Sequence, residues 1–312
     1  MTGFDNPLSP CDMGAMADSQ QILCIGSVLW DVIGRSAATM RAGSDVPGRI
    51  TRVPGGVALN IAMTLRRFGL APALLTTIGR DEEGDELITR CNQMSLLTDF
   101  VYRSEDLPTD IYMAIEGGNG LIAAIADAHS LEAAGDKILR PLADGTLGSA
   151  DAPYPGVIAL DGNLTEALLS EIAQSPLFVA ADLRVAPASP GKAERLLPLL
   201  GHPRATLYVN KEEAGYLCQR GFETAPEAAQ ALVERGAPRA LVTDGGAETA
   251  DATGGGLIVA TPPEVMVTRV TGAGDTFMAA HIAAETRGQD RATALNAALS
   301  AAASYVSGDV PQ

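Results

Sequence analysis

Short apolar runs rich in Val, Ile and Leu alternate along this chain with stretches of helical periodicity, and this alternation constrains its fold most. Buried strands that alternate with amphipathic helices are typical of a parallel sheet with helices on both faces. The predicted strands are Ile22–Ile25, Leu74–Ile78, Val157–Leu160, Leu177–Ala180, Thr206–Val209 and Ala240–Thr243. The predicted helices are Ala58–Phe68, Glu83–Gln93, Thr165–Ala173, Lys192–Leu200, Pro226–Arg235 and Asp275–Thr286. We therefore expect an α/β fold that binds ligands at the carboxyl ends of its strands.

Two segments interrupt the alternation and predict a smaller β-structure beside the main sheet. Gly34–Val53 has little periodicity, and Asp110–Ala126 has two strand-like runs around a Gly-rich turn. We expect these segments, about 34–53 and 110–126, to form a β-lid over the strand ends. Residues 20–312 would make one domain that includes the lid. Residues 1–19 have three Asp and no Lys or Arg, which predicts a disordered leader and not a signal peptide.

The charge and the cysteines of the chain narrow its partners and its compartment. The formal net charge is −16, and an acidic surface repels nucleic acid polymers and anionic membranes. The four Cys are widely spaced and form no disulfide or zinc pattern, and no apolar run approaches the ~20 residues of a membrane span. We expect a cytoplasmic protein in which any phosphate is bound locally by backbone donors, a few cations or a metal.

The segment Thr-Gly-Ala-Gly-Asp, which ends at Asp275, has the strongest chemical signal. The three small residues 272–274 let the backbone turn tightly and expose its N–H groups where the last predicted helix begins. A helix N-terminus attracts anions, so these donors could hold a phosphoryl group. We expect Asp275 to stay ionised and to accept a proton from a hydroxyl that attacks this phosphoryl. The alternative is an ordinary loop in which Asp275 is only an N-cap.

Weaker signals lie at the other predicted strand ends. Gly55 and Gly56 precede a helix that contains Asn60, and the missing side chains would permit close approach of a polar ligand. Asp31 lies just past the first predicted strand. Two further segments offer oxygen ligands for a hydrated Mg²⁺ and a turn for nucleotide phosphates; they are Asn210-Lys211-Glu212-Glu213 and Thr243-Asp244-Gly245-Gly246. Taken alone, each signal is better explained as a cap or a turn.

In their order and spacing these motifs closely resemble the ribokinase-like carbohydrate kinases, also called the PfkB family. The family's GG-x-x-x-N-x-A signature is met at Gly55, Gly56, Asn60 and Ala62. Its N-x-x-E motif is met at Asn210 and Glu213. Its D-T-x-G-A-G-D-x-F signature is met from Thr271 to Asp275 and at Phe277. The resemblance runs from about residue 20 to 305.

The resemblance implies a three-layer α/β/α sandwich with a mostly parallel central sheet and a β-lid that closes over the substrate and often mediates dimers. Asp275 would be the base that deprotonates a substrate hydroxymethyl group. The N–H groups of Gly272, Ala273 and Gly274 would stabilise the γ-phosphoryl group as it leaves ATP.

The resemblance also implies the remaining ligand contacts. Substrate hydroxyls would be held by Asp31, Gly55, Gly56 and Asn60. ATP would be contacted by Asn210, Thr243, Gly245, Thr271, Gly272, Gly274 and Asn296, the last of them near the adenine. Glu213 would organise Mg²⁺ through water.

One position departs from the family pattern. Where the family usually has Asp two residues before the Thr of its last signature, this chain has Arg269. In many members this Asp belongs to a monovalent-cation site that helps to shape the anion hole. We hypothesise that Arg269 partly replaces the cation and makes activity insensitive to K⁺. The alternative is that Arg269 points to solvent.

The substrate is less constrained by the sequence. Within the family, segments 47–50, 124–127 and 161–164 look most like pseudouridine kinases, whereas Gly26–Val32 looks more like fructokinase-type members. The main hypothesis is ATP-dependent phosphorylation of the 5′-hydroxymethyl of a ribosyl nucleoside, with pseudouridine as the best candidate. The alternatives are a kinase for a free sugar such as ribose, fructose or a keto-deoxy sugar, and a catalytically inactive binding protein with the same fold.

Overall fold

The main sheet has eight strands and confirms the predicted α/β class. The computed structural model describes residues 21–41 and 43–308, so the predicted leader lies outside the described residues. The strand order is β14-β13-β12-β11-β10-β9-β1-β4, in which all strands from β12 to β4 are parallel and β13 and β14 form an antiparallel hairpin. The strands are β1 (Gln21–Ile25), β4 (Ala71–Leu75), β9 (Val157–Asp161), β10 (Asp182–Ala186), β11 (Ala205–Asn210), β12 (Arg239–Thr243), β13 (Thr249–Thr253) and β14 (Gly256–Ala260).

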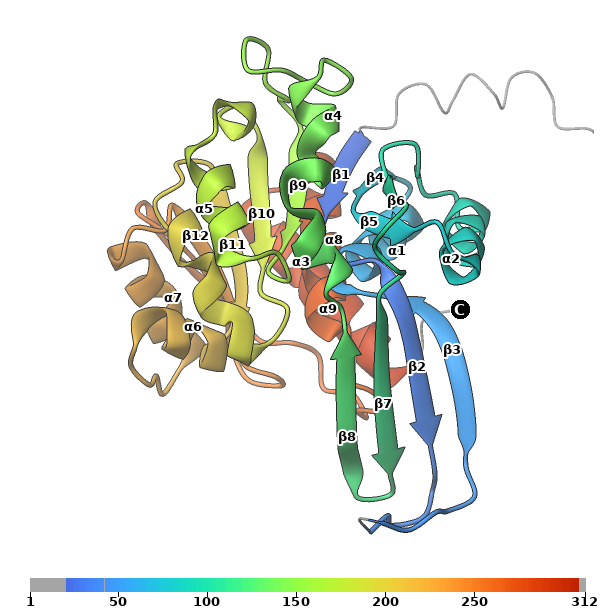
Figure 1. Ribbon diagram of the computed structural model, residues 1–312. Helices are drawn as coiled ribbons and strands as arrows, with labels where there is room; N and C mark the ends of the chain where they lie inside the picture. The colour runs from blue at the N-terminus through green and yellow to red at the C-terminus, as the bar shows by residue number, and fades with distance from the viewer. Residues whose placement is uncertain (1–20, 42, 309–312) are drawn as a thin grey trace, which may run out of the picture.

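Helices cover both faces of this sheet, as the apolar strands predict (Figure 1). Leu23 and Ile25 of β1 belong to the core that packs against the first set of helices, and Ile22 and Cys24 belong to the core on the opposite face. The first set is α5 (Glu166–Gln174), α6 (Lys211–Cys218) and α7 (Ala225–Glu234). The second is α1 (Val57–Arg67), α2 (Glu82–Gln93), α8 (Ala273–Thr286) and α9 (Arg291–Ser307). The result is the three-layer sandwich expected from the sequence.

A second sheet of four strands projects from the body (Figure 1). Its order is β3-β2-β7-β8, and its strands are β2 (Leu29–Arg35), β3 (Arg49–Gly55), β7 (Ile111–Gly117) and β8 (Gly120–Asp127). Strand β2 begins at Leu29, so this sheet includes Asp31. Asp31 pairs with Val53 of β3 on one side and with Tyr112 of β7 on the other. Since only residues 26–28 separate β1 from β2, this sheet leaves the body at the carboxyl ends of the parallel strands.

Shorter elements complete the described part of the chain. They are β5 (Thr77–Gly79), β6 (Tyr102–Ser104), α3 (Ser130–Ala134), α4 (Arg140–Ala143) and 3-10 segments at 135–139, 176–178 and 190–199. No helix among residues 21–41 and 43–308 is long and apolar enough to cross a membrane.

Three of the predicted elements were wrong in detail. The strand predicted at Leu177–Ala180 is absent because Pro176 starts a 3-10 turn, capped by Ser175, that buries Phe178. The strand that follows is β10, in which polar residues hide the apolar pattern. The predicted strand Leu74–Ile78 is divided between β4 and β5, which lie in different sheets. The helix predicted at Lys192–Leu200 is a 3-10 segment with Pro198 inside it.

Candidate active site

The N-terminus of α8 provides backbone donors that no other group uses. Gly272 caps the helix in a left-handed conformation, with φ of +87°, which explains the need for glycine there. The N–H of Ala273 donates to the Val270 carbonyl at 3.0 Å, so one of the three predicted donors is already occupied. Within the described chain, the N–H groups of Gly272 and Gly274 enter no hydrogen bond. Of the three predicted donors, they are the two left to bind an anion at this helix end.

Asp275 lies in the first turn of α8 and accepts a hydrogen bond from a residue on α1. Its Oδ2 accepts a hydrogen bond of 2.9 Å from Asn60 Nδ2 of α1, a residue 215 positions earlier in the chain. Burial raises the pKa of Asp275 to about 7, against the lowering effect of the Asn60 hydrogen bond. The nearby carboxylates of Asp161, Glu213 and Asp31 raise it further. We expected an ionised Asp275 from the sequence, but a pKa near 7 leaves about half of these carboxyl groups protonated at neutral pH.

The two glycines before α1 make close contacts, Gly55 with a side chain and Gly56 with the backbone. Gly55 packs so tightly against Asp31 that an added Cβ would lie 2.0 Å from a carboxylate oxygen. Gly56 has φ of +102°, and its Cβ would lie 2.4 Å from the Ser27 carbonyl oxygen. Burial raises the pKa of Asp31 to about 6. Of the predicted substrate contacts, Asp31 lies beside Gly55, and Asn60 lies beside the predicted base.

A buried pair that the sequence did not reveal holds the start of α1 in place. The backbone N–H and the hydroxyl of Ser27 both donate to Asp161 Oδ2, at 2.8 and 2.6 Å. The same hydroxyl accepts from the Val57 N–H at 2.9 Å, which ties the end of β1 to the first residue of α1. Asn163 also donates to this hydroxyl, and Lys192 donates to Asn163. Asp161 directly ends a buried strand, the same signal that singled out Asp31.

Asn210 and Glu213 form a reciprocal cap at the start of α6. The Glu213 N–H donates to Asn210 Oδ1 and the Asn210 N–H donates to Glu213 Oε2, both at 2.8 Å. Burial raises the pKa of Glu213 to about 7. Glu213 Oε1 stays outside this cap. One free carboxylate oxygen fits a magnesium ion that keeps its waters and is bound mainly by phosphates. No group of three or more acidic, His or Cys side chains in the described chain could hold a metal alone.

The remaining predicted ATP contacts lie on three separate elements. Thr243 ends β12, and Gly245 follows in a turn with φ of +57°. Lys211 of α6 donates to Asp244 at 2.7 Å, which fixes this turn beside the cap of α6. Asn296 lies on the exposed face of α9, where its Nδ2 donates to the Ala292 carbonyl.

Two other predicted positions, Arg269 and Thr271, lie in the irregular segment before α8. The Thr271 carbonyl accepts from the Tyr305 hydroxyl at 2.9 Å. Arg269 does not simply point to solvent, because its Nε donates to the Tyr305 carbonyl at 2.8 Å and its guanidinium lies over the Tyr305 ring. Tyr305 was not singled out in the sequence.

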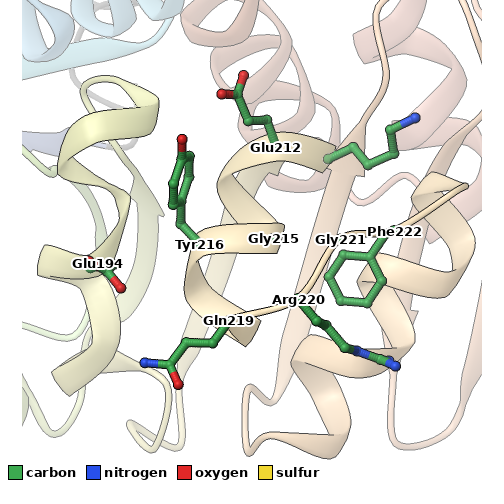
Figure 2. Close-up of a pocket in the computed structure, with 9 residues that line it drawn as sticks. Glu194, Glu212, Gly215, Tyr216, Gln219, Arg220, Gly221 and Phe222 are labelled. Atoms are coloured by element: carbon green, nitrogen blue, oxygen red, sulfur yellow. The ribbon is translucent and has the colours of Figure 1, made fainter.

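An open cavity of about 470 Å³ lies along α6. It is lined by Lys211 and Glu212 of the predicted Asn210–Glu213 segment but by none of the residues to which a catalytic, substrate, ATP or metal contact was assigned. Figure 2 shows Tyr216 and Glu212 on α6, with Glu194 on one side and Phe222 and Arg220 on the other. This cavity is open to solvent, and its charged side chains have mixed signs and do not gather around one point. The strand ends beside α8 are therefore the stronger candidate for the active site.

Comparisons with known proteins identify a family that matches most of the chain. The family described as "pfkB family carbohydrate kinase" matches residues 19–309. A pseudouridine kinase of Escherichia coli (strain K12) is 29% identical over 274 residues, which are 85% of this chain and 83% of the relative. A guanosine-inosine kinase of Exiguobacterium acetylicum is 28% identical over 305 residues, 92% of this chain and 94% of the relative. A solved carbohydrate kinase from Agrobacterium tumefaciens has a TM-score of 0.77 at 26% identity, with 93% and 94% of the two chains covered.

Proposed function

This chain belongs to the pfkB family of carbohydrate kinases, and from that premise we propose that it phosphorylates the 5′-hydroxymethyl group of a ribosyl nucleoside, with pseudouridine as its acceptor. The family makes it an ATP-dependent sugar or nucleoside kinase. The proposal adds the acceptor and the residues that act on it.

The observation that carries the mechanism is the meeting of Asp275 with two unused backbone donors at one helix end. Asn60 donates to Oδ2 of Asp275, and no residue in the described chain donates to Oδ1. We assign to Oδ1 the proton of the acceptor hydroxyl. As the hydroxyl oxygen bonds to the γ-phosphorus, the bond from phosphorus to the bridging oxygen breaks and ADP leaves with the electron pair. The N–H groups of Gly272 and Gly274 stabilise charge on the transferring phosphoryl group.

The environment of the site favours acceptance of a proton near neutral pH. A base with a pKa near 7 binds the released proton well and is still deprotonated in a useful fraction of molecules. Magnesium would neutralise phosphate charge among these acidic side chains, with Glu213 and Asn210 orienting its water ligands. Thr243, Gly245, Thr271 and Asn296 stay proposals for the contacts to ATP.

The names of two relatives favour a nucleoside over a free sugar. The two relatives named above that match most of the chain are named for nucleoside substrates. Asp31 and Asn60 also supply a carboxylate and an amide for ribosyl hydroxyls, although a free sugar could use both in the same way. A free-sugar kinase is therefore the second candidate, favoured by the similarity to the solved carbohydrate kinase.

An acceptor panel separates these candidates. The purified protein is mixed with Mg·ATP and, in turn, pseudouridine, uridine, adenosine, guanosine, inosine, ribose and fructose, and ADP release is followed. We expect the highest kcat/KM with pseudouridine. The nucleoside proposal fails if ribose or fructose is used as well as pseudouridine. ATP binding without ADP release with any acceptor would instead support an inactive binding protein.

The second sheet is the surface we propose for homodimers. Residues paired across its strands point to the same face, and the register puts Ile50, Met113, Ile115 and Ile125 together on the face opposite Asp31. Ile50 and Ile125 are 77% and 67% exposed. We expect a dimer in light scattering that Ile125→Glu converts to a monomer; a monomeric parent protein would contradict this. Cytoplasmic location likewise stays a proposal.

A further inference from the structure

The chain that leads into the anion-binding turn is fastened to the last turn of α9. The N–H groups of Thr268 and Arg269 both donate to the Val306 carbonyl, at 2.8 and 3.3 Å. The hydroxyl of Thr268 donates to the same oxygen at 3.0 Å. Carbonyls in the last turn of a helix have no partner within the helix, so this segment satisfies one of them. The C-terminal end of α9 is therefore hydrogen-bonded to the segment that leads into α8.

Tyr305 extends this connection to the peptide that begins the anion-binding turn. Its hydroxyl donates to the Thr271 carbonyl at 2.9 Å. An added Cβ on Gly272 would lie 2.5 Å from the same hydroxyl oxygen, so the phenol packs directly against the glycine. The Thr271 carbonyl and the Gly272 N–H belong to one planar trans peptide and point in opposite directions. A hydrogen bond that holds the carbonyl also fixes the direction of the N–H.

Arg269 holds the Tyr305 side chain in the required place. Its guanidinium carbon lies 3.9 Å from the centre of the ring, within the range of a cation–π contact. Its Nε donates to the Tyr305 backbone carbonyl at 2.8 Å. A cation at the C-terminal end of a helix is also favoured by the helix dipole. The guanidinium thus fastens both the ring and the backbone of Tyr305.

We propose that Tyr305 is a positioning residue that, held by Arg269, aims the Gly272 N–H at the transferring phosphoryl group. The proposal rests on the proposed kinase function and adds the end of the chain to the machinery of that site. The hydroxyl also polarises the Thr271–Gly272 peptide, which makes its N–H a stronger donor. The variant Tyr305→Phe tests this role because it removes one oxygen and keeps the ring over which Arg269 lies.

The first readout is kinetic. Tyr305→Phe should lower kcat about tenfold, the factor expected for one lost hydrogen bond at the upper end of the usual range, with the KM of the acceptor unchanged. Tyr216→Phe is the matched control, since Tyr216 lies on α6 and is 46% exposed; it should leave kcat unchanged. If Arg269 acts through the hydroxyl of Tyr305, Arg269→Gln should cost much less in the Tyr305→Phe background than in the parent protein.

The second readout needs no acceptor. Aluminium fluoride with Mg·ADP mimics the transferring phosphoryl group, so the gain in ADP affinity on adding aluminium fluoride reports on the anion-binding donors. Tyr305→Phe should reduce this gain about tenfold and leave the affinity for ADP alone unchanged. If Tyr305→Phe keeps both the kcat of the parent protein and its gain in ADP affinity on adding aluminium fluoride, the proposal is wrong. If no acceptor in the panel is phosphorylated, the acceptor assignment fails while this binding test still decides the role of Tyr305.

Discussion

Replacing Asp275 by Asn should stabilise the folded protein above pH 7. Burial raises the pKa of Asp275 from the ordinary 3.8 to about 7, so its ionisation is unfavourable in the folded state. The folded protein keeps this proton to higher pH than the unfolded chain does. The stability that Asp275 contributes is therefore complete below about pH 4 and is lost as the pH rises to about 7. Asparagine does not ionise, so Asp275→Asn avoids this loss.

The rise in pKa corresponds to a loss of folding free energy of about 4 kcal/mol when Asp275 ionises. This value is an upper limit because the side chain retains some contact with solvent. We expect the free energy of unfolding of Asp275→Asn, relative to the parent protein, to rise by about 1–4 kcal/mol between pH 4.5 and pH 8.5. Urea unfolding followed by circular dichroism measures this at both pH values. Asp151→Asn, which removes the same charge from an exposed loop, is the control. A stability difference that does not change with pH would refute the argument.

Three further predictions concern the reaction. The acid limb of the pH profile of kcat/KM should lie near pH 7. Asn60→Ala should move this limb to higher pH, because the hydrogen bond that lowers the pKa of Asp275 is lost. A limb that does not move would contradict the contact between Asn60 and Asp275. Glu213→Gln should raise the Mg²⁺ concentration for half-maximal rate several-fold, measured by titration at fixed ATP, and an unchanged titration would exclude Glu213 from the metal site. Exchange of Na⁺ for K⁺ at constant ionic strength should leave the rate unchanged because Arg269 already supplies a fixed cation beside the anion-binding turn; a several-fold increase would disprove this.

The local parts of the site could be predicted from the sequence. A run of small residues followed by an apolar-periodic stretch predicted a helix from Asp275, and α8 begins two residues earlier, at Ala273. The left-handed conformation of Gly272 and the close contacts of Gly55 and Gly56 explain why glycine was informative at these positions. Turns and helix starts depend on neighbouring residues, and neighbouring residues are what a single sequence displays.

Contacts between distant segments could not be predicted in this way. Ser27 and Asp161 are 134 positions apart and meet only because β1 and β9 are neighbours in the sheet. Tyr305 reaches Thr271 only because α9 packs beside α8. Nothing local distinguishes Ser27 or Tyr305 from other Ser or Tyr residues on the chain, and the position of Asp161 at a strand end does not reveal its partner.

A buried charge caused the main error in the predicted fold, which was to place a strand before β10 and not at β10. Arg184 lies in the middle of β10 and is buried. Its guanidinium donates hydrogen bonds to Asp182, Glu285 and the Tyr208 hydroxyl. Its charge is compensated by Asp182 on the same strand and by Glu285 on α8, and the sequence of the strand does not show the second of these partners. Hydrophobic periodicity therefore favoured the apolar run before β10 over β10 itself.

The most direct test of the account is the turnover of Asp275→Asn with Mg·ATP and the preferred acceptor. Asparagine keeps the shape of the side chain but cannot accept the proton at neutral pH, so turnover should fall at least ~10²-fold while the affinity for ATP stays that of the parent protein. Turnover close to the parent value would contradict the assignment of Asp275 as the base.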